Sequence, residues 1–145
     1  MFDLLPKLEK VLDKSKDFSL LILRLTLAYG FLIPALNKIQ SFNSVVTWFE
    51  QDLHIPFPWL NALLATTTES LGVILLSLGL CTRFISLPLS FIMLIAIITV
   101  HGFESFSAAE NGFEIPLYYL VMLFVLIGTG AGKYSLDEAL SRKAS

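Results

Sequence analysis

Charge, cysteine and histidine are all scarce in this chain. Of its 145 residues only 15% are charged, the formal net charge is −2, and there are two histidines and one cysteine. Binding to phosphate backbones needs a concentrated basic surface, so we expect no nucleic acid partner. The single thiol, Cys81, excludes an internal disulfide and a Cys-x-x-Cys redox pair. Any electron transfer that involves this chain must therefore use another group.

Apolar sequence, by contrast, is abundant, with 55% hydrophobic residues. Four long apolar runs cover residues 19–36, 62–80, 84–100 and 115–132. A hydrocarbon core about 30 Å thick needs roughly 20 mostly apolar residues per helical span, so each run is interpreted as a transmembrane helix. We expect an all-α fold, a polytopic membrane four-helix bundle, in contact with the lipid bilayer.

Basic residues are distributed unevenly around these four runs. Those outside the runs lie almost entirely in the first, third and last connecting segments: Lys7, Lys10, Lys14, Lys16, Arg83, Lys133, Arg142 and Lys143. Lys38 is the only lysine or arginine in the two remaining loops. The positive-inside rule then places both the N- and the C-terminus in the cytoplasm and the two long loops outside.

Two shorter helices are expected beside the four spans. In residues 1–17, leucines recur at helical spacing among lysines and acids, which indicates an amphipathic helix in the inner membrane interface and leaves no apolar run for a cleaved leader. Docking of a cytoplasmic partner is the alternative role for this helix. In the first outer loop, Val45, Trp48 and Phe49 share a helical face, which predicts a short interfacial helix.

The expected organisation has three parts. They are an interfacial amphipathic helix (1–17), a four-helix transmembrane domain (18–133) and a cytoplasmic tail (134–145).

Two of the runs contain a full charge, Arg24 in the first and Glu69 in the second. An ionisable group at membrane depth costs several kcal/mol, roughly, unless it is paired, so such residues usually have a function or a partner. The opposite signs favour an Arg24–Glu69 pair, and the reach of the Arg side chain makes the contact feasible. This buried polar centre either binds a ligand or only holds the first two spans in register.

A second group of polar residues is expected at the outer ends of the spans. His101 follows the third span, Glu114 precedes the fourth, and Lys38 follows the first. A histidine in such a place can titrate or hydrogen-bond a carboxylate, and the three residues would form a polar mouth above the Arg24–Glu69 centre. Glu114 has an alternative role as a helix cap. Two histidines without fixed spacing are not a metal motif, so no metal site is expected.

Several short motifs together resemble the DoxX family of bacterial membrane proteins. They are Leu23-Arg24-Leu25, Glu69-Ser70-Leu71-Gly72, Gly79-Leu80-Cys81-Thr82-Arg83 and Gly130-Ala131-Gly132-Lys133-Tyr134-Ser135-Leu136-Asp137. The Asn-Gly-Phe-Glu-Ile-Pro-Leu-Tyr-Tyr stretch at 111–119 is similar to the subgroup found in bufferin-type copper-stress gene clusters.

This resemblance implies a multi-pass protein of the bacterial inner membrane that accompanies oxidoreductases. The expected role is an accessory, non-catalytic subunit of a redox or metal-stress system, covering oxidative and copper stress, although direct catalysis is left open. No covalently bound cofactor is expected, and a quinone is the candidate ligand of the buried centre. A membrane or periplasmic redox or metal-handling protein is the expected partner, and a homo-oligomer is left open. The alternatives are a transporter or export partner for a proton- or metal-linked cargo, and a structural membrane scaffold.

Overall fold

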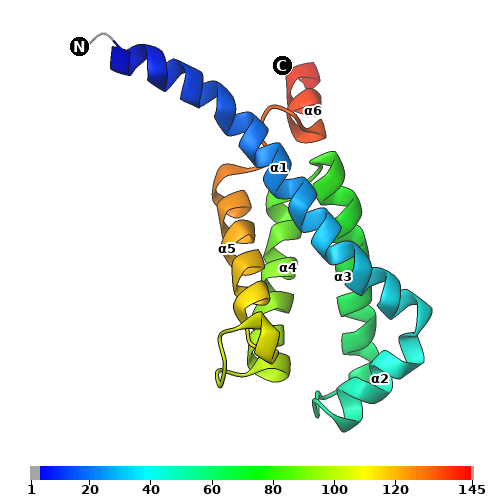
Figure 1. Ribbon diagram of the computed structural model, residues 1–145. Coiled ribbons are helices and arrows are strands. Elements are labelled where there is room, and N and C mark those ends of the chain that lie inside the picture. The colour runs from blue at the N-terminus through cyan, green and yellow to red at the C-terminus, as the bar shows by residue number, and fades with distance from the viewer. Residues whose placement is uncertain (1–3, 145) are drawn as a thin grey trace.

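The computed structural model describes residues 4–144, and in this range all regular structure is helical (Figure 1). The helices are α1 (Leu4–Gln40), α2 (Phe42–Gln51), α3 (Pro58–Leu78), α4 (Thr82–Ala96), α5 (Glu114–Thr129) and α6 (Leu136–Ala144). A π-helical turn, η1 (Ile97–His101), continues α4, and a 3-10 turn, η2 (Ala108–Glu110), lies in the loop before α5.

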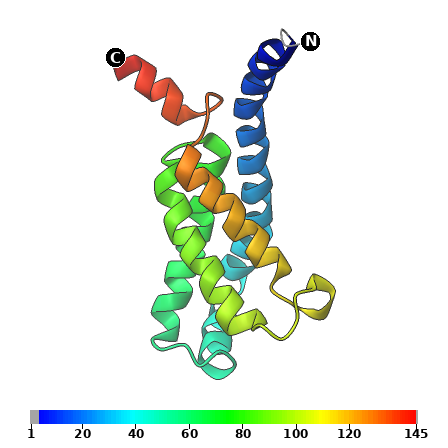
Figure 2. The same cartoon turned by 90° about the vertical axis from the view of Figure 1, so that its left-hand side faces the viewer.

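The chain termini and the long loops lie at opposite ends of the bundle. Both chain termini lie at one end, which we call the terminal end, and α2 lies at the opposite end, the loop end (Figures 1 and 2). The loop between α4 and α5 also lies at the loop end. The prediction of an all-α, polytopic membrane fold is confirmed.

Three helical segments are long and apolar enough to cross a membrane: Ser15–Gln40, Pro58–Leu78 and Thr82–His101. The predicted fourth span is shorter than expected, because α5 has 16 residues and is therefore only about 24 Å long. The helix ends before Gly130, whose φ of 81° and ψ of −163° lie outside the helical region. The fourth helix is thus present, but it ends three residues earlier than the apolar run.

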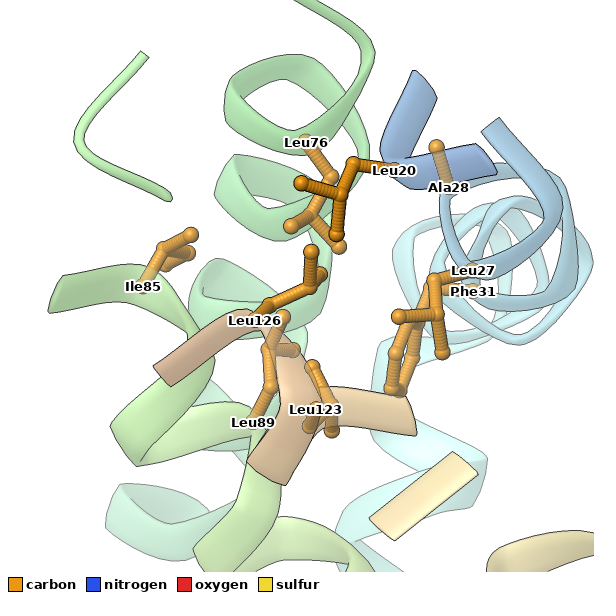
Figure 3. Close-up of a cluster of buried hydrophobic side chains, with 9 residues drawn as sticks. All are labelled: Leu20, Leu27, Ala28, Phe31, Leu76, Ile85, Leu89, Leu123 and Leu126. Atoms are coloured by element: carbon orange, nitrogen blue, oxygen red, sulfur yellow. The ribbon is translucent and has the colours of Figure 1, made fainter. Parts of the chain in front are cut away.

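The four long helices pack as two pairs. Helix α1 lies against α3, α4 lies against α5, and the contact between α3 and α4 joins the pairs. The core contains leucines, one phenylalanine, one isoleucine and one alanine from all four helices: Leu20, Leu27, Ala28, Phe31, Leu76, Ile85, Leu89, Leu123 and Leu126 (Figure 3). Large apolar side chains such as Tyr29, Phe84 and Phe124 cover the outside, as a lipid-facing surface requires.

The segment before the first span differs from our expectation. Residues 4–17 are helical, but they are continuous with the span in one 37-residue helix. This part of α1 extends beyond the bundle at the terminal end (Figure 1). Residues 1–3 of the expected amphipathic helix lie outside the described residues. Its placement in the membrane interface stays a prediction.

The predicted short helix of the first outer loop is present as α2. It packs against α3 and buries Phe49, while the ring of Phe42 contacts that of Trp59 in an edge-on arrangement with centroids 6.4 Å apart. Helix α2 therefore closes the loop end of the α1–α3 pair, and it begins four residues after Lys38.

Candidate functional site

Lys38 and Glu69 form a buried ion pair between α1 and α3. The Lys38 Nζ atom donates to both carboxylate oxygens of Glu69, at 2.8 Å from Oε1 and 2.6 Å from Oε2. The side chain of Glu69 is 3% exposed and that of Lys38 is 18% exposed. A charge-assisted contact of this geometry offsets much of the cost of placing both charges among apolar helices.

The expected Arg24–Glu69 pair is wrong. Arg24 is fully buried, but its Nη1 donates to the main-chain oxygen of Leu76 at 3.1 Å and its Nη2 to that of Tyr134. Glu69 is bound to Lys38 instead. The predicted polar centre is therefore two separate sites, one toward each end of the bundle.

The direction in which helical side chains tilt explains why the pairing differs. Every Cα–Cβ bond in a helix tilts toward the helix N-terminus. Helix α1 begins at the terminal end and α3 at the loop end, so Arg24 and Glu69 tilt away from each other. Lys38 and Glu69 tilt toward each other.

Distances along the helices support this explanation. Leu76, which contacts Arg24, is seven residues beyond Glu69, or about 10 Å along α3. Lys38 is 14 residues beyond Arg24 on α1, or about 21 Å. Glu69 thus lies at a level between the two basic residues, and the tilt decides which of them it meets.

Arg24 belongs to a second cluster, which we call the terminal latch and define as Arg24, Gly79, Tyr134, Ser135 and Asp137. Through its two hydrogen bonds, Arg24 ties the end of α3 to the segment that follows α5. Gly79 has φ 66° and lies against the guanidinium group, so that a Cβ atom there would collide with Arg24 Nη1. Glycine alone both adopts this positive φ without strain and leaves room for the guanidinium group.

Asp137 completes the terminal latch at the start of α4. Its carboxylate accepts hydrogen bonds from the main-chain nitrogens of Cys81 at 2.8 Å and Thr82 at 3.1 Å. Its own main-chain nitrogen donates to Gly79 O at 3.0 Å. A carboxylate in this position caps α4 and interacts favourably with its dipole. At the start of α6, Glu138 N donates to Ser135 Oγ at 3.2 Å.

The predicted polar mouth of His101, Glu114 and Lys38 is not assembled by the contacts of these residues. His101 Nδ1 donates to Asn111 O at 2.8 Å, so its hydrogen bond lies within its own loop. Glu114 accepts from Ala108 N at 3.0 Å and from the Tyr118 hydroxyl at 3.0 Å. Both residues stabilise the loop between α4 and α5, whereas Lys38 belongs to the α1–α3 pair.

No group of three or more His, Cys, Asp or Glu side chains suited to a metal ion occurs within the described residues 4–144. A hollow of about 310 Å³ lies at the terminal end near Asp17 and Lys133, whose side chains form an ion pair at 3.3 Å. This hollow is open to solvent and is separate from the Lys38–Glu69 pair.

Sequence reasoning missed the roles of Gly79 and Asp137. Both are in motifs that carry the DoxX resemblance, but a motif alone does not show which residues meet. The partner of Glu69 was within reach of the sequence, because the opposite directions of the first two spans follow from their alternation across the membrane. Applying the tilt rule to those directions would have favoured Lys38 over Arg24.

Comparison with known proteins identifies the family. The DoxX family model matches residues 19–102, which is more than half of the chain. The chain belongs to the DoxX family. The matched region contains Arg24, Lys38, Glu69 and Gly79, so both halves of the Lys38–Glu69 pair lie in the DoxX part of this protein.

Three relatives of this DoxX protein have no assigned function. An uncharacterized protein of Haemophilus influenzae is 36% identical over 131 residues, covering 86% of this chain and 84% of its own. A second uncharacterized protein of that organism is 30% identical over 135 residues, covering 91% and 98%. An uncharacterized membrane protein of Mycobacterium tuberculosis is 26% identical over 150 residues, covering 97% and 92%. No solved structure was found to match.

Proposed function

We propose that this DoxX protein is an inner-membrane accessory subunit of a redox or metal-stress system, and that its Lys38–Glu69 pair binds a quinone-like molecule. The observation that carries the proposal is a buried ion pair within the membrane-spanning part of α1 and α3. Ionisable groups kept at membrane depth are usually functional. The terminal latch accounts for Arg24 as a structural residue, whereas the Lys38–Glu69 pair has both a donor and a proton acceptor to offer.

The chemistry of the pair suits a quinone. An ammonium group has three N–H donors, and contacts to the two Glu69 oxygens use two of them, which leaves one for a ligand carbonyl. A carboxylate next to that carbonyl can exchange a proton with the hydroxyl of the reduced quinol. Lys38 is also the more exposed partner, so a ligand that arrives from the lipid meets the ammonium group first.

The rest of the system is supplied by other proteins in this proposal. A membrane or periplasmic redox or metal-handling protein provides the electrons, and the DoxX chain holds the acceptor. A role in copper stress stays a prediction from the resemblance to bufferin-type clusters, as does a homo-oligomer. The cytoplasmic location of both termini is part of the proposal and rests on the distribution of basic residues.

Calorimetric titration of the purified protein in detergent with decylubiquinone tests ligand binding. We expect micromolar binding that weakens at least tenfold in Lys38→Met and in Glu69→Gln. Lys133→Met is the matched control, because Lys133 also forms an ion pair but at the terminal end, and it should bind as the wild type does. Thermal unfolding of each variant checks that the fold is retained.

Equal binding by all four proteins would refute the quinone site. In that case, a proton-flux assay in proteoliposomes distinguishes the two alternative functions, the transporter and the scaffold. Proton flux that Glu69→Gln abolishes would favour the transporter, and the absence of both binding and flux would favour the scaffold.

A further inference from the structure

We propose that α6 lies on the membrane surface at the terminal end, with Leu136 and Leu140 immersed among lipids and Lys143 against lipid phosphates. This inference concerns an interaction surface and does not depend on the quinone site.

The terminal latch fixes where α6 begins. Asp137, in the first turn of α6, binds the main-chain nitrogens of Cys81 and Thr82 at 2.8 and 3.1 Å. Thr82 is the first residue of the membrane-spanning segment Thr82–His101. The start of α6 is therefore held at the depth where that span leaves the hydrocarbon core. A helix attached at this depth lies near the headgroups.

Beyond its first turn, α6 is largely separate from the bundle in the described part of the chain. From its start, α6 runs obliquely outward and beyond the top of the bundle, away from α1 (Figure 2). Its two leucines, four residues apart and so on one side of the helix, are 41% and 55% exposed. Together the two leucines form an apolar face that the lipids next to the span can cover.

The charged residues of α6 favour a lipid surface over an apolar protein partner. Lys143 is exposed and lies three residues from Leu140, on nearly the same side. A lysine beside immersed leucines can reach the phosphate layer with its flexible stem. Arg142 is bound to Glu138 at 2.9 Å, so it balances the acidic residue on the side away from the leucines.

Spin labels on the full-length protein test the proposal in vesicles of phosphatidylethanolamine and phosphatidylglycerol. With Cys81→Ser as background, one label is attached at Leu140→Cys and a control label at Glu138→Cys, which is about 160° away around the helix. Collisions with oxygen report lipid, and collisions with a water-soluble nickel chelate report solvent. We expect the Leu140→Cys label to favour oxygen at least threefold over the control label.

Two collision results would overturn the placement of α6 among lipids. Strong nickel collisions at both positions would mean that α6 stands in solvent. Weak collisions with both reagents at Leu140→Cys would mean that a protein, such as a second copy of this chain, covers the leucines. Replacing phosphatidylglycerol with phosphatidylcholine should reduce the immersion of the label, and Lys143→Gln should remove this lipid dependence. A Lys143→Gln protein that still responds to the lipid exchange would refute the contact of Lys143 with anionic headgroups.

Discussion

Replacing Gly79 with alanine should destabilise the protein by about 3 kcal/mol. The left-handed φ of 66° costs alanine about 1 kcal/mol relative to glycine. The added Cβ also collides with Arg24 Nη1 and displaces the guanidinium from Leu76 O. A hydrogen bond to a charged donor contributes about 1.5–3 kcal/mol, and the two costs add because they have separate causes.

Equilibrium unfolding in dodecylmaltoside micelles with increasing SDS, followed by far-ultraviolet circular dichroism, measures this change. Gly128→Ala is the matched control, since Gly128 lies in α5 and a Cβ there meets nothing within 4 Å. Alanine in that helix should raise the free energy of unfolding, by up to about 1 kcal/mol. If Gly79→Ala unfolds within about 0.5 kcal/mol of the wild type, the terminal latch does not stabilise the fold as described.

Three further predictions concern the cap of α4, the topology and the helix packing. Asp137→Ala should lower the free energy of unfolding in the same assay by about 1–2 kcal/mol, because it removes the cap of α4; an unchanged value would contradict the cap. A reporter fused after Ser145 should behave as cytoplasmic and one inserted near Asn43 as external, and the reverse pattern would refute the orientation. Gly30→Ala should destabilise the bundle because a Cβ collides with the Tyr119 ring, and Tyr119→Ala in the same chain should recover part of the loss; additive losses would exclude that contact.

The hydrophobic pattern predicts most of the fold. Runs of nearly 20 apolar residues have few alternatives to membrane helices. The helical spacing of Val45, Trp48 and Phe49 predicts α2. The end of α5 was harder to predict, because residues 130–132 are apolar enough to continue a span but adopt the backbone of a loop. Composition does not record such conformations.

The site was less predictable than the fold. Sequence identifies Arg24 and Glu69 as buried charges, and both are buried. Their partners depend on side-chain tilt and on contacts between distant segments, such as Arg24 with Tyr134, 110 residues apart. A main-chain carbonyl is the same in every residue, so no sequence motif indicates that Arg24 binds one.

A pair of double-mutant cycles tests the central claim, that Glu69 is paired with Lys38 and not with Arg24. Each single substitution, Lys38→Met or Glu69→Leu, leaves one buried charge unpaired and should cost about 3–5 kcal/mol, whereas the double variant should recover at least 1 kcal/mol, roughly, of the summed loss.

The second cycle combines Glu69→Leu with Arg24→Met and is measured by the same unfolding assay. Because these residues share no contact partner, their losses should add within about 0.5 kcal/mol. Strong coupling between Arg24 and Glu69, with additive losses for Lys38 and Glu69, would contradict the account.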